Sequence, residues 1–300
     1  MLQLSLLMRN NKSLLTIFLI VFIDLLGFGI ILPLLPYIAE KYSAGPFQIG
    51  ILTASYSFFQ LIAAPILGRL SDRYGRKKLL IISQLGSAVG YLILGLAGNL
   101  PLLFLSRIID GITGGNISIA QAYIADVTDK KNRAKGMGII GAAFGLGFIF
   151  GPAIGGFLSR FSYSAPAFFA TAVSLLSVFA TIFFLKETID EKKAITSPKT
   201  KLNLKEFQRI LSIYPIGILI IIFFVTNLAA SIQQGNFALW TQKTFNYGPA
   251  ENGWLFAYIG IIAVFVQLKI LPFLTIKFEE KTILYISLFF MFIGLSLIPF

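Results

Sequence analysis

The sequence predicts an all-α integral membrane protein, and two observations lead to this fold class. Hydrophobic residues make up 56% of the 300 residues and the mean hydropathy is +0.82, which would leave a soluble domain of this size with too little polar surface. The apolar residues are gathered in runs of about 20, the length of helix that crosses a hydrocarbon layer about 30 Å thick. Basic residues lie in the gaps between these runs.

The apolar runs predict nine membrane spans. The first extends from Leu14 to Pro36 and contains one carboxylate, Asp24. It is too long for a cleaved signal peptide and lacks a small-residue cleavage site. The other eight spans are expected near residues 47–67, 79–98, 101–125, 136–158, 165–185, 210–236, 252–276 and 282–300.

The distribution of positive charge predicts the orientation of these spans. Of the 25 Lys and Arg, 21 fall on one side, Lys41, Arg160 and Lys243 fall on the other, and Arg107 lies within a span. Because Lys and Arg are enriched in cytoplasmic loops, we expect the N-terminus in the cytoplasm. Topology therefore explains the net charge of +12 better than nucleic-acid binding does, since the basic residues do not follow one face.

We expect a six-helix N-terminal bundle over residues 1–186 and a partial, three-helix C-terminal bundle over residues 210–300. Residues 187–209 between them are charged and lack apolar periodicity, which predicts a cytoplasmic linker.

An internal repeat supports the division into two halves. Gly45-Pro46 recurs as Gly248-Pro249, and the same offset places Asp24 opposite Asn227. A duplicated bundle is a recurrent architecture of secondary transporters. By this repeat we expect about three further spans beyond Phe300.

Two residue types that the chain lacks limit its chemistry. There is no cysteine and no histidine, which excludes disulfides, thiolate metal sites, Ser-His-Asp triads and histidine-based zinc sites. The glycine-rich stretch 141–156 lies within an apolar span and lacks the strand and the Lys-Ser/Thr pair of a phosphate loop. We therefore expect no enzyme activity, no cofactor and no metal, an ion gradient as the energy source, and carboxylates as proton carriers.

The stretch from Gly68 to Lys78 is a polar turn between two spans. It contains five basic residues and one acid, Asp72, so neither neighbouring span can absorb it into a bilayer. The basic surplus places it in the cytoplasm.

Four stretches together resemble signatures of the major facilitator superfamily. The Gly68–Lys78 turn resembles its cytoplasmic loop, and Arg107 with the glycines that follow resembles its fourth helix. Residues 141–156 resemble the glycine-proline signature of proton antiporters. Asp24-Leu-Leu-Gly-Phe-Gly resembles the first helix of the drug-efflux branch, especially the tetracycline exporters. Phe290 stands about where those exporters carry an aspartate, which weakens tetracycline as the substrate.

The resemblance implies a major facilitator fold in a cell membrane, expected to be a bacterial inner membrane. It also implies a cytoplasmic gate, in which an aspartate engages neighbouring arginines and a late helix of the second half. The residues that match this gate are Gly68, Asp72, Arg73, Gly75 and Arg76.

Asp24 is the first candidate for proton coupling, because an ionisable residue within a span costs about 3 kcal/mol or more and marks a functional site by default. The alternative is a carboxylate satisfied by backbone near Gly27 and Gly29. The repeat adds Asn227 to the expected cavity, at the position that corresponds to Asp24.

A second set of candidates lies on the fourth span, at alternating steps of four and three residues that define one helical face. These residues are Arg107, Gly111, Gly114, Ser118 and Gln121. We expect Arg107 to couple to a carboxylate such as Asp24, and the alternative is a static bond from Arg107 to helix carbonyls. Asp110, one turn away, is a rival proton carrier and a candidate counter-ion of Arg107.

On the fifth span, small residues recur every four positions, a spacing that lets another helix approach closely. The residues concerned are Gly141, Gly145, Gly147, Gly151, Pro152, Gly155 and Gly156.

Together these features predict a proton-coupled exporter of small amphipathic or drug-like compounds that works by alternating access. We expect protons, a small-molecule substrate and the lipid bilayer as partners, and a monomer at full length. A metabolite importer or symporter, and a truncated protein that only binds a ligand, are the two alternatives.

Overall fold

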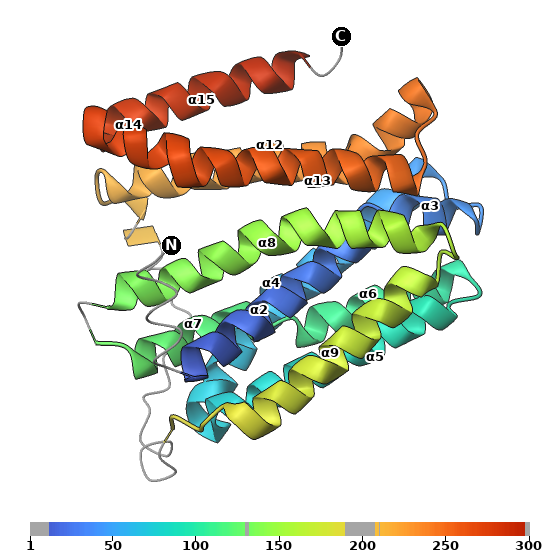
Figure 1. Ribbon diagram of the computed structural model, residues 1–300, viewed down its shortest axis with the longest axis horizontal. Helices are drawn as coiled ribbons and strands as arrows, with labels where there is room; N and C mark the ends of the chain where they lie inside the picture. The colour runs from blue at the N-terminus through green and yellow to red at the C-terminus, as the bar shows by residue number, and fades with distance from the viewer. Residues whose placement is uncertain (1–11, 130–131, 190–207, 210, 298–300) are drawn as a thin grey trace.

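The computed structural model describes residues 12–129, 132–189, 208–209 and 211–297, and its regular elements are all helices (Figure 1). The first group of helices is α2 (Lys12–Ile31), α3 (Leu35–Glu40), α4 (Pro46–Tyr74), α5 (Arg76–Leu96), α6 (Leu100–Thr113), α7 (Asn116–Val127), α8 (Arg133–Ser159) and α9 (Ala165–Phe184). The second group is α12 (Ile216–Phe245), α13 (Pro249–Phe265), the π-helical turn η1 (Val266–Ile270), α14 (Leu271–Lys277) and α15 (Glu280–Leu297).

Within the described residues, eight helical segments are long and apolar enough to cross a membrane, with α6 and α7 counted together. The helical path from Pro249 to Lys277, through α13, η1 and α14, occupies the remaining span position that the sequence predicts. The predicted linker falls largely on residues 190–207, outside the described residues.

Four expected spans differ from the helices observed. The second helix, expected near residues 47–67, continues to Tyr74, so most of the predicted Gly68–Lys78 turn is helical and the turn itself is Gly75. The first helix ends at Ile31 instead of Pro36, because Pro33 lacks the N–H that would continue it. The fourth span is divided between Thr113 and Asn116, where Gly114 leaves the helical conformation with a ψ of 42°. The predicted span 210–236 is displaced, since α12 extends to Phe245.

The two halves begin corresponding helices in the same way. Gly45 is the N-cap residue of α4 and Pro46 follows it, while Gly248 and Pro249 begin α13. In each case the residue three positions after the cap, Gln48 or Glu251, accepts a hydrogen bond from the cap N–H at 2.9 Å. The repeat seen in the sequence is therefore also present in the local structure.

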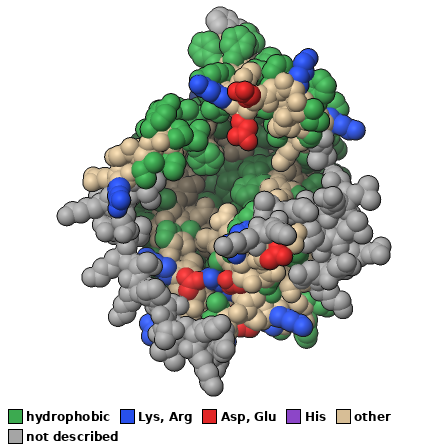
Figure 2. Space-filling view, turned by 90° about the vertical axis from the view of Figure 1, so that its left-hand side faces the viewer, with side chains coloured by type: hydrophobic (Ala, Val, Ile, Leu, Met, Phe, Trp, Pro, Cys, Tyr) green, Lys and Arg blue, Asp and Glu red, His purple; other side chains and the backbone are tan. Residues whose placement is uncertain are grey.

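The helices of the first group run between two ends of the molecule, which we call the Gly75 end and the Gly45 end. The Gly75 end holds the α4–α5 turn, and the Gly45 end holds α3 and the start of α4; they lie on the left and right of Figure 1. Figure 2 views the Gly75 end and shows it hollowed near its centre, with hydrophobic side chains inside the hollow and charged groups around it.

Helix α8 lies between the two groups and packs most extensively against α2 on one side and α13 on the other. A Cβ atom on Gly151 would lie 2.8 Å from the backbone of Gly29 in α2. On the other side, a Cβ atom on Gly156 would lie 2.9 Å from Gly253 of α13. Because lipid provides no hydrophobic drive for helix pairing, such close backbone contacts are what hold these helices together.

The second group exposes most of its apolar surface. In the most apolar 18-residue stretch of α2, 61% is buried, whereas the buried share of the same length of chain is 6% in both α12 and α15. Apolar side chains on these two helices therefore face outward, as expected for surfaces that contact lipid.

Candidate functional site

Asp24 lies in the interior of the first group. Its Oδ1 accepts a hydrogen bond of 2.7 Å from Nδ2 of Asn116, the first residue of α7. The break between α6 and α7 makes this contact possible, because it places Asn116 at a helix start instead of continuing the fourth span. Sequence reasoning missed Asn116, although an amide directly after Gly114-Gly115 within an apolar span was a signal.

Arg107 and Asp110 form a buried ion pair on α6. Their side-chain atoms Nη1 and Oδ2 are 3.3 Å apart, and the two residues are 3% and 2% exposed. The guanidinium also lies 5.6 Å from the ring centroid of Tyr91, and its Nη2 has no hydrogen-bond partner. Of the two carboxylates considered for Arg107, the structure pairs it with Asp110.

The other residues predicted for this cavity are more dispersed. Gln121 is exposed on α7, beyond the break that divides the predicted face. Asn227 is exposed on α12 and donates to the carbonyl of Phe223 in its own helix at 2.7 Å. The structure thus brings Asp24, Arg107 and Asp110 into one bundle but does not bring Asn227 against them.

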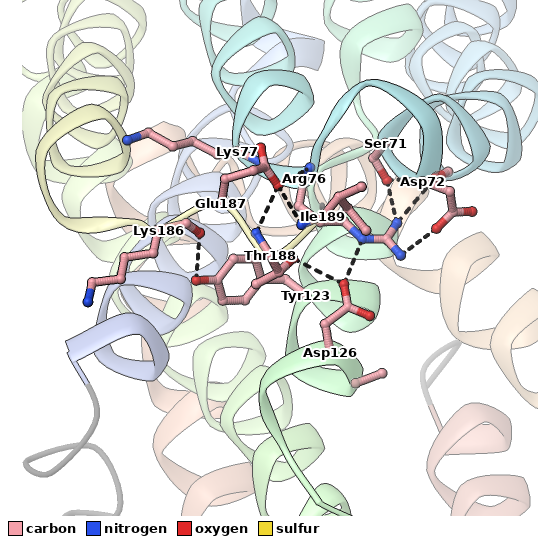
Figure 3. Close-up of polar contacts among 12 residues, drawn as sticks. Ser71, Asp72, Arg76, Lys77, Tyr123, Asp126, Lys186, Glu187, Thr188 and Ile189 are labelled. Carbon is pink, nitrogen blue, oxygen red and sulfur yellow. Dashed lines mark hydrogen bonds and ion pairs between the residues drawn. The ribbon is translucent and has the colours of Figure 1, made fainter. Parts of the chain in front are cut away.

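The Gly75 end carries a network of charges centred on Arg76 (Figure 3). Arg76 is 6% exposed; it pairs with Asp72 one turn earlier and, at 3.0 Å, with Asp126 at the end of α7. Its Nη1 donates to the hydroxyl of Ser71 at 2.6 Å. Gly75 has a φ of +103°, which requires glycine for the sharp turn that directs Arg76 inward.

Glu187 joins the segment after α9 to the same network. Its two carboxylate oxygens accept hydrogen bonds from the backbone N–H groups of Arg76 and Lys77, at 2.9 and 3.2 Å. A carboxylate at this position also complements the positive end of the α5 dipole. Arg73, by contrast, is exposed and lies over the ring of Tyr74.

Asp126 and Glu187 were not predicted as members of this network. The signal was available, because the chain has just 13 acids and both lie where an apolar run ends. Gly68 contributes its carbonyl to Ser71, at 2.6 Å.

The packing residues of α8 divide between two partners. A Cβ atom added to Gly147 or Gly155 would lie 2.7 Å from Leu25 or Ile30 of α2, respectively. Pro152 contributes its carbonyl to the contact with α13, 2.6 Å from the Cβ position of Gly253. Gly145 has its nearest neighbour, Val264 of α13, at 3.7 Å, and Gly141 has open space around it.

The Gly45 end holds the hydrogen bonds that join described residues of the two groups. The Tyr37 hydroxyl donates to the carbonyl of Tyr247 at 2.9 Å and accepts from Nδ2 of Asn252 on α13. Asn252 in turn accepts a 2.8 Å bond from Thr241 on α12. We call these four residues, with the nearby Gln242–Glu40 bond of 2.9 Å, the Tyr37 latch.

Burial raises the pKa of Tyr37 from its ordinary value of 10.0 to about 12, with a smaller opposing effect from the Asn252 hydrogen bond. The charges of Glu40 and Glu251 contribute to this rise. The phenol is therefore a neutral donor at ordinary pH. No signature in the sequence indicated this latch, because its members are single polar residues in otherwise unremarkable helix ends.

A groove of about 430 Å³ lies between α12 and α15. Its lining is mostly apolar, with Phe237, Trp240 and Leu295, and includes the side-chain amides of Gln233 and Asn236. Cavities of about 300 to 1,000 Å³ with this mixture are typical of small-molecule sites.

The family of this chain follows from its similarity to known proteins. The model of the Major Facilitator Superfamily matches residues 17–300. The chain belongs to this superfamily. As a major facilitator protein it is a multi-pass membrane transporter and not an enzyme, so the predictions of family and fold class are confirmed.

Its relatives include drug-resistance proteins of bacteria. The chain is 33% identical over 283 residues to "Tetracycline resistance protein, class H" of Pasteurella multocida, covering 93% of this chain and 70% of the relative. It is 34% identical over 282 residues to "Multidrug resistance protein 2" of Bacillus subtilis (strain 168), covering 91% and 70%.

Solved structures show the same fold. The human organic anion transporter MFSD10 (TETRAN) superposes with a TM-score of 0.65 at 23% identity, over 85% of this chain and 71% of that one. A bacterial homologue of the human lysosomal transporter Spinster, in an inward-facing and unoccupied conformation, gives a TM-score of 0.66 at 18% identity, over 89% and 63%.

Proposed function

We propose that this major facilitator protein is a proton-coupled exporter of small amphipathic or drug-like compounds. The relatives named for tetracycline and multidrug resistance support export of such compounds. In this proposal the Gly75 end and the N-terminus face the cytoplasm of a bacterial inner membrane, as the excess of Lys and Arg on that side favours. The working unit is a monomer in which the bundle of residues 1–186 rocks against the one that begins at residue 210, with residues 187–209 as the linker.

The observation that carries the proton coupling is the pairing pattern of Asp24 and Asp110, the two carboxylates within apolar spans of the first group. Asp110 has a cationic partner, Arg107, whereas Asp24 has a neutral amide, Asn116. A carboxylate without a cation in an apolar span is costly to ionise, so it favours taking up a proton. With no histidine in the chain, Asp24 is the proton carrier in this proposal, and Asp110 neutralises Arg107 while Asp24 holds the proton.

The groove along α12 favours an amphipathic substrate. Its Phe237 and Trp240 offer flat apolar surface, while Gln233 and Asn236 offer hydrogen bonds without charge. A strongly anionic metabolite would find no cation among these lining residues. Phe290, where tetracycline exporters are expected to carry an aspartate, favours substrates other than tetracycline.

Opposite ends of the molecule have different roles in this cycle. The Tyr37 latch closes the Gly45 end, while Figure 2 shows the Gly75 end hollowed, an arrangement that favours a cytoplasm-facing state. The Arg76 network ties α4, α5, α7 and the segment after α9 together, so we infer that the Gly75 end of the first group moves as one body. The glycine contacts of α8 with α13 are the surface on which the groups rock.

The proposal is tested by replacing Asp24 with Asn, which retains the shape and the contact with Asn116. In vesicles that contain the protein, an imposed proton gradient should no longer drive efflux of a fluorescent amphipathic cation, whereas binding of the same compound should persist. Asp129→Asn is the matched control, because Asp129 is an exposed carboxylate at the Gly75 end. Normal gradient-driven efflux by Asp24→Asn would rule Asp24 out as the carrier.

A further inference from the structure

A small cavity lies next to Asp24 in the first group and is lined by residues of α2, α5, α7 and α9. Its volume is about 10 Å³, close to the space that a single water molecule needs. Six of its lining residues are polar: Asp24, Gln84, Ser87, Asn116, Ser174 and Ser177. An apolar cavity of this size would be empty, but a polar one is a site for water.

One acceptor in the cavity wall lacks a partner. Asn116 is 1% exposed, and while its Nδ2 donates to Asp24, its Oδ1 is buried without a hydrogen bond. Buried polar atoms in proteins are nearly always satisfied by protein or by ordered water. The orphaned Oδ1 is therefore an independent sign that the cavity holds a donor.

The far wall of the cavity is fixed in place. The Gln84 side chain donates to Ser177 at 2.9 Å and accepts from Thr181 at 3.0 Å, which uses both ends of its amide. Ser87, on the same helix α5, interacts with the carboxylate of Asp110. The cavity thus has Asp24 on one side and a hydroxyl that contacts Asp110 on another.

We propose that this cavity binds one ordered water molecule, and that the water and the Ser87 hydroxyl let Asp24 and Asp110 share a single transported proton. The inference rests on the proposed function and extends it. In the transfer, the Asp24 carboxyl gives its proton to the water, the water gives one of its own to Ser87, and Ser87 passes its hydroxyl proton to Asp110. Asp24 is left ionised and Asp110 neutral, and the water and the serine end as they began.

The transfer of a proton from Asp24 to Asp110 also changes the surroundings of Arg107. Asp110 pairs with Arg107 on its own helix, and the charge of Asp110 acts on Asp24. The Arg107 guanidinium lies over the ring of Tyr91 and lines a second cavity together with Tyr56. Once Asp110 is neutral, Arg107 loses its counter-ion. The second cavity, of about 30 Å³, lies between α2 and α4, so the proton's arrival releases the guanidinium towards that space.

Two substitutions disable the site in different ways. Ser87→Ala removes the relay hydroxyl without adding volume, and Ser174→Val fills the cavity. Thr171→Val is the matched control, because Thr171 is a buried hydroxyl on the same helix as Ser174 but does not line the cavity. Each variant is purified into lipid, and protonated carboxyl groups are followed by infrared spectroscopy during a pH titration. Gradient-driven efflux and the Kd for a fluorescent amphipathic cation are measured alongside.

In the unsubstituted protein we expect one proton distributed over two coupled carboxyl bands, both altered by Asp24→Asn or by Asp110→Asn alone. Ser87→Ala and Ser174→Val should separate the two titrations and slow efflux by about a hundredfold, the lower end of a typical proton-transfer contribution, with Kd within about twofold. Thr171→Val should behave as the unsubstituted protein does.

Coupled titrations and normal efflux in Ser87→Ala would overturn the water relay, even if Ser174→Val failed to fold. An equal loss in Thr171→Val would overturn it too, since the effect would then be one of packing. Failure of the proposed function looks different: Asp24→Asn would continue gradient-driven efflux whatever the cavity variants did.

Discussion

Arg76 and Arg73 lie three residues apart in one basic turn, yet their surroundings differ. Arg76 is buried and bonded to Asp72, Asp126 and Ser71, whereas Arg73 is exposed over Tyr74. Removing one partner of a buried charge network leaves the others unpaired, while an exposed cation contributes little. Arg76 therefore holds packed helices together because it is buried, whereas Arg73 only adds to the positive charge of the turn.

We predict that Arg76→Gln lowers stability by about 1 to 3 kcal/mol and slows turnover, because it breaks the ion pairs that join the start of α5 to Asp72 of α4 and Asp126 of α7. Both partner carboxylates are partly exposed, which keeps the effect at the lower end of that range. Arg73→Gln should change stability by no more than about 0.5 kcal/mol. Thermal unfolding in lipid-detergent micelles measures both, and equal shifts for the two variants would contradict the network.

Within the single helix α8, the glycines that pack against α2 leave no room for a larger side chain, whereas Gly141 does leave room. Gly151 lies against the backbone of α2, whereas no described residue outside the local backbone of α8 comes within 4 Å of the Cβ position of Gly141. The same substitution at these two positions therefore has opposite consequences, although both glycines belong to one repeating pattern.

Gly151→Ala should lower the stability of the protein by about 1 to 3 kcal/mol, since the added methyl forces α8 away from α2. Gly141→Ala should be neutral or stabilise by up to about 1 kcal/mol, because alanine favours the helix and meets no obstacle. The midpoint of thermal unfolding, compared between the two variants, decides this. A destabilised Gly141→Ala would mean that the glycines act by flexibility and not by close approach.

The spans and the family were predictable because apolar runs, loop charge and glycine spacing are local in sequence. The break at Gly114-Gly115 was not predicted, since the step of four and three continues smoothly across it. That break decides which residues meet Asp24: it places Asn116 against the carboxylate and leaves Gln121 exposed. The Tyr37 latch could not be predicted either, because it depends on how two distant helix ends are packed together.

At the scale of the whole molecule, the Tyr37 latch is the hydrogen-bonded closure between the two groups at the Gly45 end. The Tyr37 hydroxyl both donates and accepts, so its removal breaks the bonds to Tyr247 and Asn252 and leaves Nδ2 of Asn252 with a longer bond of 3.4 Å to the Gly248 carbonyl. Such a loss costs the closed state about 1 to 3 kcal/mol. The balance between closed and open states should shift by a factor of about ten.

We therefore predict that Tyr37→Phe increases opening at the Gly45 end. The chain has no cysteine, so a single cysteine at Ala238, which is 2% exposed in the latch, reports opening without background. In the proposed orientation the Gly45 end faces outward, so a membrane-impermeant maleimide added from outside should label it about ten times faster in Tyr37→Phe. Tyr42→Phe is the matched control, because the Tyr42 hydroxyl bonds to Ala97 within the first group. Equal labelling rates in both variants would contradict the latch.

The raised pKa of Tyr37 determines how closure at the Gly45 end depends on pH. A pKa raised from 10.0 to about 12 leaves the contribution of the phenol to closure fully present below pH 10, and it is lost between pH 10 and about 12. Glu40 can accept its bond from Gln242 whether it is ionised or not. The closure at the Gly45 end therefore does not change over the pH range in which carboxylates titrate, so in the proposed mechanism the pH profile of transport follows Asp24 and Asp110.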